Sequence, residues 1–130
     1  MLPFKHKLIF LVDDDEDERF MLWRAFQKNH PACLLFTFSN GQELLDHLTA
    51  GYDIPDLIVL DLNMPVLDGV MTWKQLKLNS RFRSIPTVVL EPPFETSPGL
   101  QRENVRPDPL LAKPTTYRDL VQLTHRLCAG

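Results

Sequence analysis

Short apolar runs recur along the chain, separated by stretches in which apolar residues return at helical spacing. The first run, residues 8–12, reads LIFLV and ends abruptly at acidic residues. A continuous apolar run of this length is typical of a strand that is buried on both faces of a parallel sheet. Similar runs predict strands at residues 34–38, 57–60 and 87–90, and a short fifth strand at residues 110–112.

The stretches between these runs predict helices. Asp14 or Asp15 is placed to cap a helix over residues 16–29, whose apolar stripe should face the core. This stripe consists of Met21, Leu22, Ala25 and Phe26. The other predicted helices span residues 42–49, 70–78 and 117–128. Strands that alternate with helices predict right-handed crossovers, and therefore a doubly wound α/β fold with one parallel sheet covered on both faces.

Residues 91–109 do not follow this alternation, because they contain five of the eleven prolines of the chain. Proline inside a helix removes a hydrogen-bond donor and clashes with the preceding turn. The sequence therefore predicts a fourth helix that is shortened or irregular. At best, a short helix starts at Pro98 with Ser97 as its cap.

Composition and charge narrow the function classes. The chain has 130 residues, of which 44% are hydrophobic, so we expect a single globular domain over residues 1–130. The net charge of -3 gives no basic footprint, which disfavours nucleic-acid binding. No apolar run is long enough for a signal peptide or a membrane span, so a soluble cytoplasmic protein without membrane contact is expected.

Cysteine and histidine add no chemistry at this level. Cys33 and Cys128 stand at no metal-ligand spacing from each other and are interpreted as ordinary thiols in a reducing compartment. A disulfide between them stays open. The four histidines are scattered and are interpreted as surface or structural residues. They are His6, His30, His47 and His125.

Acidic residues follow two of the predicted strands, and a lysine follows a third. Asp13 and Asp14 end the first strand, Asp61 ends the third, and Lys113 ends the fifth. The carboxyl ends of parallel strands meet at one edge of the sheet, where three carboxylates repel one another unless a cation intervenes. An oxygen-rich cluster suits Mg²⁺, and a nearby ammonium pairs first with a carboxylate and then with phosphate oxygens. These parts together predict phosphoryl transfer to an aspartate.

At these residues the sequence resembles the receiver domains of two-component response regulators, including the chemotaxis regulators. The matching segments are residues 11–15 (LVDDD), residues 55–69 (PDLIVLDLNMPVLDG) and the pair Lys113-Pro114. The resemblance extends over about residues 7–127. It implies a flavodoxin-like fold with a five-stranded parallel sheet in the order 2-1-3-4-5.

The resemblance also implies a role for each matching residue. Asp61 corresponds to the phosphoacceptor and Lys113 to the lysine that contacts the phosphoryl group. Asp13 and Asp14 correspond to the acids that hold Mg²⁺, Asp14 more directly, and the backbone carbonyl of Asn63 completes the metal site. The implied partners are a histidine kinase or phosphotransfer protein and an unknown downstream protein. Such a receiver is not an enzyme for a separate substrate, and at most it promotes its own phosphorylation and dephosphorylation.

Two residues depart from the family pattern. Glu91 stands where the family has Thr or Ser, and Leu110 stands where it often has Tyr or Phe. A carboxylate at position 91 cannot donate a hydrogen bond, and we expect it to pair with Lys113 instead. A pseudo-receiver that works by protein contacts alone is therefore the alternative function. A phosphatase-like hydrolase is weaker still, because Asn63 stands where it would need a second acid.

Overall fold

The computed structural model describes residues 7–62, 69–92, 100, 106–107 and 109–128. Its centre is a five-stranded sheet in the order β2-β1-β3-β4-β5, in which every neighbouring pair is parallel. The strands are β1 (Leu8–Val12), β2 (Leu34–Phe38), β3 (Leu57–Asp61), β4 (Thr87–Glu91) and β5 (Leu110–Ala112). The predicted doubly wound fold and its strand order are confirmed.

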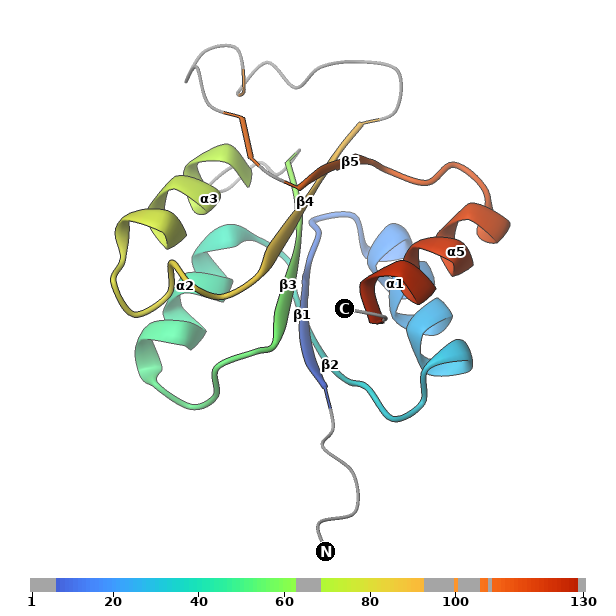
Figure 1. The fold of residues 1–130 in the computed structure, drawn as a ribbon, viewed down its shortest axis with the longest axis horizontal. Helices are drawn as coiled ribbons and strands as arrows, with labels where there is room; N and C mark the ends of the chain where they lie inside the picture. Colours follow the sequence, from blue (N-terminus) through green and yellow to red (C-terminus); the bar gives the residue numbers. More distant parts are fainter. Residues whose placement is uncertain (1–6, 63–68, 93–99, 101–105, 108, 129–130) are drawn as a thin grey trace, which may run out of the picture.

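Helices cover both faces of this sheet (Figure 1). The helices are α1 (Glu16–Asn29), α2 (Gly41–Ala50), α3 (Gly69–Leu78) and α5 (Tyr117–Cys128). Figure 1 shows α1 and α5 together on one side of the sheet and α2 and α3 on the other. The predicted fourth helix falls in a stretch of which only residues 91–92, 100, 106–107 and 109 are described, so its form stays a prediction. No helix in the described ranges combines the length and the apolar character that crossing a bilayer requires.

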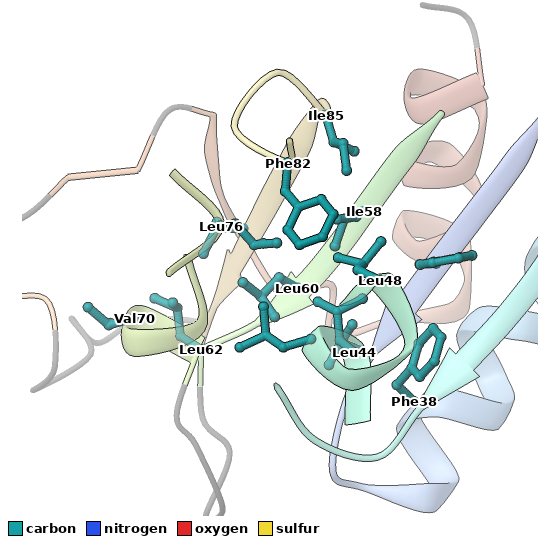
Figure 2. Close-up of a cluster of buried hydrophobic side chains, with 14 of the residues drawn as sticks. Phe38, Leu44, Leu48, Ile58, Leu60, Leu62, Val70, Leu76, Phe82 and Ile85 are labelled. Carbon is teal, nitrogen blue, oxygen red and sulfur yellow. The ribbon is translucent and has the colours of Figure 1, made fainter. Parts of the chain in front are cut away.

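Alternation along β1 divides the core into two clusters. Successive side chains of a strand point to opposite faces. Ile9 and Leu11 therefore pack with α1 and α5, whereas Phe10 and Val12 pack with α2 and α3. Figure 2 shows the second cluster, in which the strand residues Ile58 and Leu60 lie against side chains from both helices. Since both faces of β1 are buried, the strand is a continuous apolar run in the sequence.

The structure corrects two details of the predicted burial. Met21, which was expected in the buried stripe of α1, is 38% exposed, while Leu22 is buried. At β2 the sheet is not fully covered, and Leu34 and Phe36 are 50% and 40% exposed. The reason is the position of β2 at the edge of the sheet, where one flank of the strand has no neighbouring strand to pack against.

A side-chain cap fixes the start of α1. Asp15 has an extended backbone, and its carboxylate accepts a hydrogen bond of 3.0 Å from the Glu18 N–H. This bond satisfies one of the first N–H groups of the helix, which have no partner within it. Of the two candidates in the sequence, Asp15 rather than Asp14 is thus the cap.

Replacement of Asp15 by alanine should lower the free energy of unfolding by about 1 kcal/mol, because the cap bond is lost. Urea denaturation measures this change. Asp17→Ala is the matched control, since it removes one negative charge from the same helical turn without removing a cap. Equal losses in the two variants would show that only the charge matters and that the cap contributes nothing.

Candidate functional site

Two buried carboxylates meet at the carboxyl edge of the sheet. Val12 of β1 lies beside Leu60 of β3, so Asp13 and Asp61, each one residue further on, lie on neighbouring strands. The Asp13 N–H donates to the carbonyl oxygen of Phe38 on β2, which extends the strand pairing by one residue. Asp13 and Asp61 are only 5% and 3% exposed. The sheet therefore brings together two of the three acids that the sequence singled out, Asp13 and Asp61.

Lys113 approaches both carboxylates from β5. Its backbone N–H donates to the carbonyl oxygen of Glu91 over 2.8 Å, which fixes the residue at the end of the sheet. Its Nζ lies 3.2 Å from Asp61 Oδ2 and 3.4 Å from Asp13 Oδ2. One ammonium thus bridges two buried acids, as the sequence predicted for Asp61.

Glu18 is a third acidic partner, which the sequence analysis did not single out. Its Oε2 forms a short ion pair with the Lys113 ammonium from the first turn of α1. Oxygen atoms of Asp13, Glu18 and Asp61 all lie within 4.8 Å of one another. Nothing in the local sequence separates Glu18 from the solvated acids that precede it, since only the packing of α1 against the sheet brings it to the site.

Burial makes the charge on Asp13 unfavourable. Desolvation, followed by the nearby charge of Asp61, raises its pKa to about 7, although a hydrogen bond from the Asp15 N–H and the charge of Lys113 act in the opposite direction. Burial on its own would lower the pKa of Lys113. The hydrogen bond to Glu18 and the charges of Asp61 and Asp13 outweigh it, so the pKa of Lys113 lies above its ordinary value. The site therefore holds more negative charge than one lysine neutralises.

The donor set fits a hard divalent cation. Three carboxylates supply only oxygen ligands, which Mg²⁺ prefers, and two of them are buried. A second positive charge would also relieve the repulsion that raises the pKa of Asp13. Asp13, Glu18 and Asp61 are the described residues that would hold such an ion.

Three further site residues were predicted from the sequence, namely Asp14, Asn63 and Glu91. Asp14 is exposed and lies outside this carboxylate cluster, so its role as a metal ligand stays a prediction. Asn63 falls outside the described residues. Glu91 ends β4 as predicted, but the expected ion pair with Lys113 is wrong, because Lys113 turns to Asp13, Glu18 and Asp61 instead.

A cavity of about 270 Å³ lies beside the cluster, between α1 and the segment that joins β5 to α5. Its wall combines the charged residues of the cluster with polar and apolar side chains. Among its lining residues are Asp13, Glu18, Met21, Lys113, Tyr117 and Leu120. Met21, which the helix pattern placed in the buried stripe of α1 but which is partly exposed, thus forms part of this wall.

Comparisons with known proteins agree with this geometry. The model of the response regulator receiver domain matches residues 9–125. The chain is 28% identical over 117 residues to the probable methanogenesis regulatory protein FilR2 of Methanothrix harundinacea, covering 87% of this chain and 76% of that protein. It is 29% identical to the DNA-binding transcriptional regulator NtrC of Klebsiella pneumoniae, over 92% of this chain but only 24% of NtrC.

Solved structures show the same fold. The phosphorylated cyanobacterial phytochrome response regulator RcpA superposes with a TM-score of 0.81 and 26% identity, covering 95% of this chain and 91% of RcpA. The chemotaxis response regulator CheY4 of Vibrio cholerae superposes with a TM-score of 0.72 and 26% identity, covering 95% of this chain and 99% of CheY4. The fold, the strand-end acids and the family match lead to one conclusion: the chain belongs to the response regulator receiver domain family of two-component signalling.

Proposed function

We propose that this chain is a single receiver domain that accepts a phosphoryl group on Asp61 in a reaction that requires Mg²⁺. The observation that carries the proposal is the placement of the buried Asp61 carboxylate, 3.2 Å from the Lys113 ammonium and within 4.8 Å of two further carboxylates. The related receiver RcpA is known in a phosphorylated form, which supports the same chemistry here.

In this reaction a carboxylate oxygen of Asp61 attacks the phosphorus atom of the donor. The new bond joins that oxygen to phosphorus, while the bond from phosphorus to the donor's leaving group breaks and the leaving group keeps its electron pair. Asp13, Asp61 and Glu18 would hold Mg²⁺, which would supply positive charge for the phosphoryl oxygens. Lys113, which already touches Asp61, would pair with a phosphoryl oxygen after transfer.

The donor in the cell would be a histidine kinase or a phosphotransfer protein, which presents a phosphorylated side chain to the open side of the site. The cavity between α1 and the β5–α5 segment supplies that access. Asp14 and the backbone carbonyl of Asn63 remain proposed additional metal ligands. We place the reaction in the cytoplasm, and the receiver turns over no separate substrate.

Glu91 supports a second candidate, a pseudo-receiver that acts only through protein contacts. The side chain at the end of β4 is a carboxylate rather than a hydroxyl, so it cannot donate a hydrogen bond to a phosphoryl oxygen. This feature bears on how the phosphorylated state is recognised, whereas the acids and the lysine bear on whether phosphorylation occurs at all.

Incubation with acetyl phosphate and Mg²⁺, followed by intact-mass measurement, should show one added phosphoryl group. Asp61→Asn should remove the adduct completely, because the amide is a poor nucleophile, and chelation of Mg²⁺ should prevent its formation. Asp53→Asn is the matched control, since Asp53 is an exposed aspartate outside the cluster and its replacement should leave the adduct unchanged. If the folded protein gives no adduct with any donor or divalent metal, the pseudo-receiver is correct instead.

A further inference from the structure

Two identical spacings of histidine and cysteine occur in parts of the chain that the phosphorylation site does not use. His30 precedes Cys33 by three residues, and His125 precedes Cys128 by the same three residues. These two segments contain both cysteines of the chain and two of its four histidines. Structural zinc sites are built from cysteine and histidine ligands, and their ligand pairs are commonly separated by two to five residues, as in C-x2–4-C and H-x3–5-H. Each His-x-x-Cys segment here has two residues between its ligands.

Local backbone structure holds the histidine and the cysteine of each segment close together. His30 ends α1, and the Cys33 N–H donates to the His30 carbonyl oxygen over 3.0 Å, which forms a tight turn. His125 and Cys128 lie three residues apart on α5, so they share one face of that helix. The two helices lie side by side on the same face of the sheet (Figure 1).

The two segments meet residue by residue. His30 Nε2 lies 2.9 Å from His125 Nδ1, and the sulfur atoms of Cys33 and Cys128 lie 3.4 Å apart. In a tetrahedral zinc site with Zn–N of about 2.0 Å and Zn–S of about 2.3 Å, two nitrogens are about 3.3 Å apart and two sulfurs about 3.8 Å. Each observed contact is therefore slightly shorter than an edge of such a tetrahedron.

We propose that His30, Cys33, His125 and Cys128 form a binding site for Zn²⁺ that clamps the end of α1 to the end of α5. In the structure the four donor atoms stand as two pairs. They do not form a cluster within 4.8 Å of the kind that the described residues show at Asp13, Glu18 and Asp61. Binding replaces the histidine–histidine hydrogen bond and the thiol–thiol contact, and side-chain rotation brings the pairs together around the ion.

The donor atoms determine which ion the site would take. Thiolate and imidazole ligands favour Zn²⁺ and its spectroscopic substitute Co²⁺, whereas Mg²⁺ requires oxygen ligands. Each thiol releases its proton when its sulfur binds the ion, and each imidazole donates a lone pair, so no oxidant is needed. Cys33 is buried and Cys128 half-buried, which shields the sulfurs. His125 is exposed and His30 half-buried, and the hydrogen bond between them lies at the surface, which gives the ion a path of entry.

Absorption spectroscopy with Co²⁺ tests the site in the whole, reduced protein with a phosphine reductant and excess Mg²⁺ present. We expect one Co²⁺ per chain, a thiolate-to-cobalt charge-transfer band, and its loss when Zn²⁺ is added. The acidic cluster contains no sulfur, so Co²⁺ bound there cannot give this band. The result is therefore independent of whether Asp61 is phosphorylated.

Variants assign the ligands. Cys128→Ser and Cys33→Ser should abolish the charge-transfer band, and His125→Gln should weaken Co²⁺ binding by at least about tenfold. His47→Gln is the matched control, because His47 lies on α2, on the opposite face of the sheet. This variant should bind Co²⁺ as the wild type does. Zn²⁺ should raise the melting temperature of the wild type but not of Cys128→Ser.

Several outcomes would overturn the proposal. One is a folded, reduced wild type that binds no Co²⁺, and a second is a charge-transfer band that survives in both cysteine variants. A third is a mass two hydrogens lower that persists in the presence of the phosphine, with no bound metal, which would identify the cysteine contact as a disulfide pair instead.

Discussion

Gly69→Ala should destabilise the protein by at least about 3 kcal/mol, because a side chain at this position meets backbone atoms that cannot move aside. A Cβ on Gly69 would lie 2.3 Å from the carbonyl oxygen of Asp61 and 2.5 Å from the Cα of Leu62. Gly69 is buried at the start of α3, and its N–H donates to the Leu62 carbonyl oxygen. The substitution therefore pushes directly on the strand end that carries the phosphoacceptor.

Urea denaturation and phosphorylation by acetyl phosphate measure the two consequences of Gly69→Ala. Gly51→Ala is the matched control, since Gly51 has φ of 80° but a Cβ there would meet nothing within 4 Å. It should cost only about 1 kcal/mol, the strain of a left-handed residue with a side chain. If Gly69→Ala is no more harmful than Gly51→Ala, the close approach of α3 to the end of β3 is not rigid.

Lys113→Met should lower the free energy of unfolding by about 3 kcal/mol in the absence of Mg²⁺, because it leaves two buried carboxylates without their cation. Lys113 contacts both Asp13 and Asp61, which are 5% and 3% exposed. Added Mg²⁺ should restore part of the lost stability by supplying charge at the same place. Urea denaturation with and without Mg²⁺ measures both effects.

The loss in Lys113→Met should also depend on pH. The pKa of Asp13 is raised to about 7 in the folded state, above its ordinary value of 3.8, so the folded protein binds the extra proton between these values. The stability that protonation of Asp13 contributes is therefore lost as pH rises through about 7. Because Asp13 is largely uncharged at about pH 5, the loss of unfolding free energy in Lys113→Met should be smaller there than at about pH 8. Lys28→Met, at an exposed lysine of α1, is the control and should be nearly neutral at both pH values. A full loss in this control, or no relief by Mg²⁺, would contradict the proposed electrostatics.

The candidate site shows how far residue patterns reach. Asp13, Asp61 and Lys113 were all found from the sequence, because each follows a strand and parallel strands end at the same edge of a sheet. Glu18 was not found, since its partner Lys113 is 95 residues away and lies on another element. The ion pair of Glu91 and Lys113 was predicted because Glu91 is a carboxylate that cannot donate a hydrogen bond, but the Lys113 ammonium pairs with three other carboxylates instead.

The histidines and cysteines also show that tertiary contacts decide what a sequence pattern means. His30 and His125 were interpreted as scattered surface or structural residues, and the cysteines as ordinary thiols, with a disulfide between them left open. The spacing of His-x-x-Cys was present twice in the sequence, but its meaning depends on α1 and α5 packing side by side. The two His-x-x-Cys segments come into contact only because α1 and α5, from opposite ends of the chain, share one face of the sheet.

The sequence by itself determined the alternation of strands and helices, the strand order through the family resemblance, and the acids and lysine at the strand ends. These features follow from local rules, since burial on both faces leaves a continuous apolar run and a strand end leaves an abrupt change to charge. Only the tertiary structure decided which charges meet, that Glu18 reaches Lys113, that Met21 lines a cavity, and that His30 and Cys33 touch His125 and Cys128. Those contacts join residues far apart in the chain, and their energy depends on packing and desolvation that no local pattern records.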